Sequence, residues 1–190
     1  MAMVQSSVAA DLELTPGIWT IDANHSAIVF SIRHLGLSKV RGRFSRFSSS
    51  MNVSPDQGNV GVEAEIDLSS IDTNNSDRDA HLRSTDFFNT DAEPTMRFSG
   101  NGLSGSGDDW TLTGEVTLNG VTRPLTMKVE YNGLEVYAGD GKRHAGFSAT
   151  GTIKRSEFGI DFGIMSIGVD KLALGDDVKF ELDLQFVAPE

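Results

Sequence analysis

The segment WTLTGEVTLNGVTRPLTMKVEY, residues 110–131, decides the fold. Apolar and polar residues alternate on both sides of its central Asn119-Gly120 pair. The apolar positions are Trp110, Leu112, Val116, Leu118, Val121, Leu125, Met127, Val129 and Tyr131. A period of two indicates strands with one buried face, and Asn-Gly between two such runs is a strong hairpin signal. The segment therefore predicts an antiparallel hairpin.

The same alternation continues outward from this hairpin. It is regular over Val60–Asp67 and Val178–Phe186. Less regular strands are expected around Ile18–Asp22, Ser26–His34, Val40–Ser50, Thr95–Gly100 and Gly146–Lys154. About eight strands, each with one apolar face, predict an all-β antiparallel sheet that forms a barrel or a sandwich, and closure into a barrel removes the exposed edges.

Length and the N-terminal segment bear on domain organisation and location. The 190 residues are expected to form one domain over 15–190, preceded by a flexible arm over 1–14. The arm has no Lys or Arg and carries Asp11 and Glu13 where a secretion signal would be apolar. No window approaches the roughly 18 apolar residues of a membrane span. We expect a soluble, cytoplasmic chain, or a periplasmic or secreted one if a signal has been removed.

Charge and cysteine content exclude several classes of function. The formal net charge is -11, and no cysteine is present. Nucleic acids and anionic membranes attract clustered Lys and Arg, so we expect no nucleic-acid partner, no electrostatic docking on anionic lipid and no stable membrane insertion. Thiolate catalysis and Cys-based zinc sites are excluded.

One charged segment, SDRDAHLRSTDFFNT, interrupts the strand pattern and begins at Ser76. Ser76 and Asp79 resemble a capping box, which predicts a short helix near residues 77–83. Spacing of i,i+4 would pair Asp77 with His81 and Asp79 with Arg83. The pattern favours a surface helix with solvated charge pairs, with catalysis or a polar role at a ligand entrance as alternatives.

Local motifs give no support for a metal or an active site. The four histidines, His25, His34, His81 and His144, form no pair at metal-ligand spacing, and no G-x-S-x-G elbow is present. We therefore expect no metal, no cofactor and no catalysis. The alternative is an enzyme in which His34 or His81 acts as an acid or base beside a carboxylate.

Five segments together carry a family resemblance. They are WTIDANHSAIVFSIRHLGLSKVRGRF from Trp19, IDTNNSDRDAHLRSTDFFNT from Ile71, PTMRFSG from Pro94, LTGEVTLNGVTRPLTMKVEYNG from Leu112 and GFSATGTIKRSEFGIDFG from Gly146. In that order they resemble the YceI-like family of polyisoprenoid-binding, lipocalin-like bacterial proteins, from about Trp19 to Phe186. The resemblance implies an extended antiparallel lipocalin-like β-barrel whose lumen holds the tail of an isoprenoid or similar amphiphile, without catalysis. Many members are secreted, and this chain differs by showing no signal.

The resemblance and strand parity together predict the residues that line the lumen. On the strand 26–34 the more apolar parity is placed inward, which brings His34 either to a ligand head group or to a structural position at the barrel end. The expected ligand-binding residues are Ile28, Phe30, Ile32, His34, Phe44, Phe47, Leu82, Phe87, Phe88, Met96, Phe98, Phe147, Ala149 and Phe158. Ala149 and Gly151 are small, so they either leave room for a ligand or accommodate a bulky side chain from across the barrel.

The leading hypothesis is a lipid-binding protein that stores or transports an isoprenoid quinone, a polyprenyl chain or a similar amphiphile. The other hypotheses are an enzyme that acts on a lipid in the same lumen and a filled barrel that serves as a stress-related interaction module. A homodimer is compatible with the sequence.

Overall fold

A computed structural model describes residues 8–55, 58–168 and 171–190. The strands are β1 (Gly17–Ile21), β2 (Ala27–His34), β3 (Ser38–Phe44), β4 (Phe47–Val53), β5 (Val60–Asp67), β6 (Ile71–Asp72), β7 (Thr95–Ser106), β8 (Asp109–Leu118), β9 (Val121–Val136), β10 (Arg143–Lys154), β11 (Ser166–Gly168), β12 (Lys171–Leu172) and β13 (Leu174–Val187). The helices are α1 (Val8–Asp11), η1 (Ala23–His25), η2 (Leu68–Ser70), α2 (Ser76–Arg83) and η3 (Arg155–Phe158). None of the described helices is both long and apolar enough to cross a membrane.

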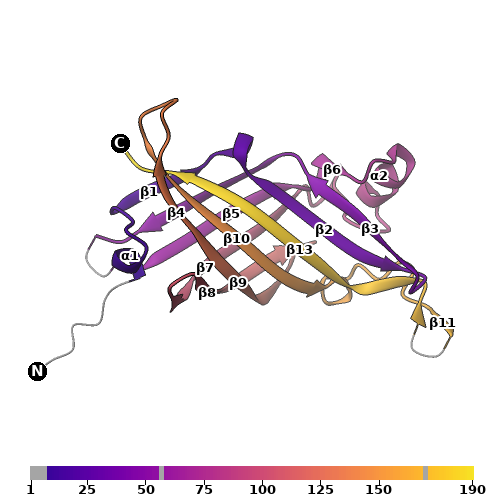
Figure 1. The fold of residues 1–190 in the computed structure, drawn as a ribbon. Coiled ribbons are helices and arrows are strands. Elements are labelled where there is room, and N and C mark those ends of the chain that lie inside the picture. Colours follow the sequence, from indigo (N-terminus) through magenta and orange to yellow (C-terminus); the bar gives the residue numbers. More distant parts are fainter. Residues whose placement is uncertain (1–7, 56–57, 169–170) are drawn as a thin grey trace, which may run out of the picture.

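The strands form a closed antiparallel β-barrel (Figure 1). Around it the order is β1-β4-β5-β7-β8-β9-β10-β13, and β13 pairs back to β1 through Thr20–Val187 and Ile21–Phe186. Further along, β13 pairs with β2, which pairs with β3 and β6. If β1 with β2, β3 with β4 and β5 with β6 each count as one bent strand, the barrel has eight strands. The predicted all-β barrel fold is confirmed.

The two ends of the barrel differ (Figure 1). At one end, called the α1 end, lie α1 and the C-terminus; at the other, called the α2 end, lie α2, the β2–β3 turn and β11. The segment from η3 to β13 and the β8–β9 turn also belong to the α2 end, since the Asn119 amide donates to the Phe158 carbonyl over 2.9 Å.

Residues 8–14 correct the prediction of a flexible arm. They include α1, and Ala9, Leu12 and Leu14 are buried. The segment crosses the α1 end: Ala9 N donates to Gly58 O, Tyr131 Oη to Leu12 O, and Arg143 Nη2 to Glu13 O, at 2.9–3.0 Å. Burial of these apolar side chains against the barrel lowers the free energy, whereas in a mobile arm they would stay exposed to water. Residues 1–7 lie outside the described part of the chain.

The predicted strand Val40–Ser50 is two strands, β3 and β4, with a bend at Ser45 and Arg46. Ser70 holds the bend, because its carbonyl accepts from Ser45 N and its hydroxyl accepts from Arg46 N, at 3.3 and 3.0 Å. The two residues of the bend change the parity, so Phe44 and Phe47 both lie on the inner side although they are three residues apart.

Helix α2 confirms the predicted helix but not its predicted contacts. Its N-cap is Asn75 rather than Ser76, and the Asn75 side chain accepts from Arg78 N over 2.9 Å. Asp79 is buried and accepts from the amide and hydroxyl of Thr73 instead of pairing with Arg83. His81 pairs with Asp86 instead of Asp77, over 2.7 Å. Thr73 and Asp86 lie in the loops before and after α2, and the i,i+4 spacing within a helix gives no information about contacts with such loops.

Phenylalanine rings cover glycines on the inner wall. Phe30 of β2 lies opposite Gly42 of β3, and Phe180 of β13 lies opposite Gly151 of β10. A Cβ at Gly42 would come within 2.4 Å of Phe30 Cζ, and a Cβ at Gly151 within 2.2 Å of Phe180 Cζ. Each ring therefore occupies the space that a side chain on the neighbouring strand would take. Gly151 therefore accommodates a bulky side chain, but this side chain comes from the adjacent strand β13 and not from across the barrel.

We predict that Gly151→Ala destabilises the barrel by about 1–3 kcal/mol, because the Phe180 ring must leave its site against the wall. Gly146→Ala on the same strand is the matched control, since its Cβ would meet Asn132 Cβ at an ordinary 3.4 Å. The control is expected to be neutral or slightly stabilising, because alanine restricts the unfolded chain. Urea unfolding of both variants measures the difference. Equal free energies of unfolding would contradict the assignment of Gly151.

Candidate ligand-binding cavity

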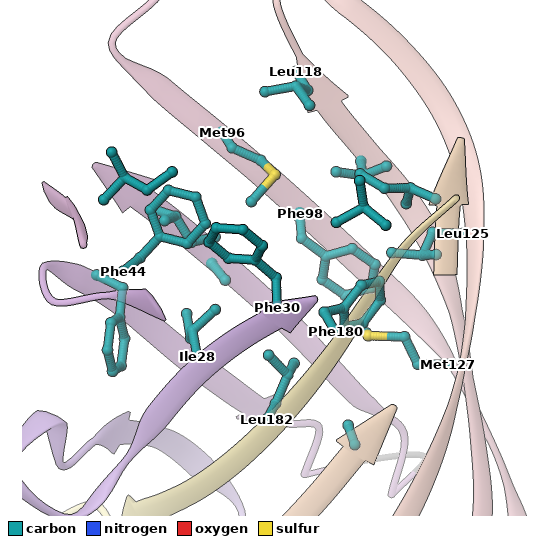
Figure 2. A pocket seen from close by; sticks show the side chains of 18 of the residues that line it. Ile28, Phe30, Phe44, Met96, Phe98, Leu118, Leu125, Met127, Phe180 and Leu182 are labelled. Atoms are coloured by element: carbon teal, nitrogen blue, oxygen red, sulfur yellow. The ribbon is translucent and has the colours of Figure 1, made fainter. Parts of the chain in front are cut away.

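The lumen of the barrel contains a cavity of about 450 Å³. Figure 2 shows side chains from β2, β7, β9 and β13 converging on it, among them Phe30, Phe98, Met127 and Phe180. They converge because the alternate residues of each strand point to the same side of the sheet, and the closed sheet brings all inner faces together.

The cavity lining is almost entirely apolar. Among its described residues the polar ones are His34, Ser48, Ser49, Thr73, Arg78, His81 and Arg155. Ser48 and Ser49 belong to β4, within the wall, and the other five lie at the α2 end. The cavity therefore runs from an apolar interior to a polar region at one end, the distribution that an amphiphile requires.

The size of the cavity argues against a packing defect. Protein interiors contain few voids larger than a water molecule, whereas ligand pockets measure roughly 300–1,000 Å³. The volume of about 450 Å³ lies within this range for ligand pockets.

All the sequence-predicted site residues except Phe158 line this one cavity. Phe158 is buried with 1% exposure but lies in the core outside the cavity, at the end of η3. The alternation of inward and outward side chains correctly predicts which strand residues line the cavity. It does not apply to Phe158, which lies four positions after Lys154, the last residue of β10.

Sequence reasoning missed two groups of lining residues. The first group lies mainly on strands that carry the same alternation, which could have identified most of it: Val40, Met51, Val60, Val62, Ala64, Ile66, Ile71, Leu103, Leu112, Val116, Leu118, Leu125, Met127, Val129, Ile153, Leu174, Val178, Phe180, Leu182, Leu184 and Phe186, with Ser48 and Ser49 of β4 and Ile160 after η3. The second group is Thr73, Arg78 and Arg155. The positions of these residues depend on loops, and no local sequence pattern predicts that they line the cavity.

Thr73 organises the polar residues beside α2. The Arg78 guanidinium donates from Nε to Thr73 Oγ1 and from Nη2 to Thr73 O, both over 2.8 Å. Thr73 in turn donates its amide and hydroxyl to the buried carboxylate of Asp79. The charged residues of α2 thus fix the helix to the strand end at β6, and they place Arg78 at the cavity.

His81 lies in an aromatic cluster at the same end. Its ring centroid is 5.1 Å from that of Phe87 and 4.9 Å from that of Phe162, and its Nε2 is 2.7 Å from Asp86 Oδ2. The cluster joins α2 to the segment after η3. In the described part of the chain the His81 imidazole is hydrogen-bonded to the Asp86 carboxylate and to no hydroxyl, and no side-chain hydrogen bond is formed by His34.

Arg155 fixes the segment that follows η3. Its guanidinium is 4% exposed and donates only to carbonyl oxygens: Gly175 from Nε, Ile160 and Phe162 from Nη1, and Leu174 from Nη2, at 2.8–3.2 Å. Burial lowers the pKa of Arg155 from its ordinary value, and the nearby carboxylates of Asp176 and Asp161 oppose this. One side chain thereby joins residues 160–162 to the start of β13.

The described residues contain no group of three or more His, Asp or Glu side chains that could hold a metal ion. Two carboxylates at the α2 end are committed to other partners, since Asp79 accepts from Thr73 and Asp176 accepts from Ser156.

Comparison with known proteins gives three relevant findings. The model of the YceI-like domain family matches residues 19–186. A UPF0312 protein of Staphylococcus aureus is 37% identical over 173 residues, which cover 90% of this chain and 98% of that protein. The crystal structure of a Campylobacter jejuni YCEI protein is 29% identical and superimposes with a TM-score of 0.68, covering 84% of this chain and 91% of the other.

A more distant structure shares the fold. A polyisoprenoid binding domain from Saccharophagus degradans, implicated in plant cell wall breakdown, superimposes with a TM-score of 0.68 at 18% identity. The alignment covers 90% of this chain and 98% of that domain.

We predict that Arg155→Lys lowers the Tm by several degrees. A lysine has three donors and no planar fork, so it leaves buried carbonyls without partners, at a cost of about 1–3 kcal/mol. Arg97→Lys is the control, because Arg97 is exposed and pairs with Glu65 at the surface. A thermal melt measures both variants. Similar Tm values for Arg155→Lys and Arg97→Lys would refute the role assigned to Arg155.

Proposed function

The chain belongs to the YceI-like family, and on that premise we propose that it binds an isoprenoid or a similar long-chain amphiphile with the apolar tail in the barrel lumen. The observation that carries this proposal is the apolar cavity of about 450 Å³, polar at its α2 end, inside a closed barrel. The ligand named for the Saccharophagus degradans domain supports it. Storage or transport of the lipid follows from such binding without any reaction.

Burial of the tail is sufficient for useful affinity. At roughly 0.8 kcal/mol per methylene, ten buried carbons contribute about 8 kcal/mol, the scale of micromolar binding before association costs are counted. The apolar wall selects a ligand by the length and thickness of its tail rather than by its functional groups. A polyprenyl chain, a quinone tail and a fatty acyl chain all satisfy it.

Head-group selection is proposed for the α2 end. His34, Arg78 and His81 border the cavity there and supply hydrogen-bond donors that an alcohol, carbonyl or phosphate could accept from. Arg155 also borders the cavity, but most of its donors are already engaged by carbonyls. Arg78 and the two histidines are therefore the better candidates for contact with the head group.

We predict that Ala149→Phe excludes the lipid while the lipid-free protein keeps its stability. Ala149 is buried, lines the cavity and lies on β10 between Val129 and Leu182, so the added ring enters the lumen. Thr150→Phe is the matched control, since Thr150 is the exposed neighbour on the outer face. Native mass spectrometry compares the co-purified lipid of both variants, and thermal melts of delipidated protein compare their stability. Wild-type lipid content in Ala149→Phe, or a strongly lowered Tm, would refute the cavity as the binding site.

A second prediction concerns ligand-dependent stability. Geranylgeraniol added to delipidated protein at about 100 times its Kd should stabilise the native state by about 2.7 kcal/mol, which raises the Tm by about 5–10 °C for a chain of this length. The Ala149→Phe variant should show a much smaller shift, because its binding volume is filled. Thermal melts with increasing ligand measure the effect. A shift of equal size in both proteins would mean that the alcohol binds elsewhere.

A further inference from the structure

Four exposed apolar side chains gather at the α2 end of the barrel. They are Leu35 and Leu37 in the β2–β3 turn and Phe162 and Met165 in the segment after η3, and Leu37 is 76% and Met165 62% exposed. We call these four residues the apolar rim. They account for four of the seven large exposed hydrophobic residues in the described part of the chain.

Backbone hydrogen bonds hold the two parts of the rim together. Leu35 N donates to Ala173 O over 2.9 Å, and Ala173 N donates to Met165 O over 3.0 Å. Leu174 N donates to Gly163 O over 3.0 Å, and Arg155 fixes the Phe162 carbonyl. The rim is therefore one surface rather than two independent loops.

The rim borders the candidate cavity. His34 precedes Leu35 and lines the cavity. Ile160 lines it from the segment that carries Phe162, and Leu174, whose amide donates to Gly163 O, lines it from the start of β13. A lipid leaving the cavity at the α2 end would meet this apolar surface first.

Cations without ion-pair partners flank the rim. Arg33, Lys39, Arg41 and Lys179 lie on β2, β3 and β13, where Arg33 is opposite Lys39, and Ser31 is opposite both Arg41 and Lys179. None of the four forms an ion pair with a described residue, whereas the next arginine on β3, Arg43, pairs with Asp72. The nearest acidic residues are Asp176, Asp177 and Glu181 on β13 and Asp161 beside Phe162, which match the four cations in number. The positive charge is therefore concentrated at Lys39 and Arg41 on β3, whose partners in register are Arg33 and Ser31 rather than acidic residues.

We propose that the apolar rim docks on a bilayer that contains anionic phospholipid, with Arg33, Lys39, Arg41 and Lys179 against the head groups. This rests on the proposed function, because docking would let an amphiphile pass between bilayer and cavity without crossing water. Such docking departs from the expectation, drawn from the formal net charge of -11, that the chain does not dock on anionic lipid by electrostatics. That charge belongs to the chain as a whole and would turn the remaining surface away from the membrane. A second copy of this chain is a poorer occupant, since a twofold contact through the rim would bring the same cations together.

Vesicle flotation tests the proposal. Wild-type protein should float with vesicles of phosphatidylcholine and phosphatidylglycerol, bind pure phosphatidylcholine more weakly, and be released as salt shortens the Debye length from about 30 Å at 0.01 M to about 3 Å at 1 M. Leu35→Ser with Leu37→Ser should weaken binding at least about tenfold, because two leucines no longer insert. Leu37→Ser alone, at the most exposed position of the rim, serves if the double variant folds poorly.

Matched controls come from the other end of the molecule. Ile18 and Val136 are 60% and 62% exposed and lie at the α1 end, so Ile18→Ser with Val136→Ser should leave flotation unchanged. For the charges, Arg33→Gln with Lys39→Gln should remove the preference for phosphatidylglycerol. Lys128→Gln on β9 with Lys142→Gln beside the C-terminal Glu190 should retain it, because these lysines lie away from the rim. Equal flotation of the Leu35/Leu37 and Ile18/Val136 variants would overturn the proposal. So would a dimer in sedimentation velocity that the Leu35/Leu37 variant dissociates.

The test separates docking from lipid binding. Native mass spectrometry of the same Leu35/Leu37 variant should still show co-purified lipid, because no substituted residue lines the cavity. Lipid in the cavity without wild-type flotation would overturn docking alone. Flotation without any lipid in the wild-type cavity would overturn the proposed function and, with it, the transfer role of the rim.

Discussion

The structure depends on the pairing of β13 along both of its edges. One edge pairs with β10 over eleven residue pairs, from Lys154–Asp177 to His144–Val187. The other edge pairs with β2 and then with β1, so the last strand in the chain closes the sheet onto the first two. A closed sheet has no free edge to pair with another chain, and all its inner faces share one space. The apolar parity of β13 must therefore point inward, and the parity of every neighbour follows from the register.

A closed barrel of eight strands can be filled by its own side chains, and here glycines help to keep it hollow. Phe30 and Phe180 lie against Gly42 and Gly151 instead of meeting side chains on the neighbouring strands. The rings still contribute apolar surface to the lumen, but part of their volume is taken up by the wall. The outcome is a cavity that is apolar without being full, and this property, rather than any single residue, supports lipid binding as the proposed function.

The sequence predicts those parts of the fold in which the alternation of apolar and polar residues along a strand is sufficient to determine the structure. Over residues 60–67, 110–131 and 178–186, one side of each strand faces water and the other faces the lumen, so alternation alone identifies strands and inner faces. The rule fails at Ser45 and Arg46, because the bend is stabilised by Ser70, 24 residues from Arg46. It fails again at Asp79, whose buried carboxylate binds Thr73 rather than the i+4 arginine. Phe158 resembles a wall residue in composition, yet its place after the last residue of β10 puts it outside the cavity. In the first two cases the deciding partner lies in the segment between β5 and α2, and in the third the residue itself lies beyond the strand. Strand or helix periodicity carries no information about any of them.

The asymmetry of the two ends gives the cavity a direction. At the α1 end Leu12, Leu14 and Trp19 are buried but do not line the cavity, and hydrogen bonds from Tyr131 and Arg143 hold residues 12 and 13 across the barrel. At the α2 end the lining becomes polar, and the neighbouring surface carries unpaired cations and exposed leucines. A tail that enters first would meet apolar side chains until it reaches the closed end, while a polar head left at the α2 end avoids the cost of burying an unsatisfied polar group. Under the proposed function, the two ends therefore favour one orientation of an amphiphile, with its head toward α2, and the proposed docking would place exchange with a bilayer at that end.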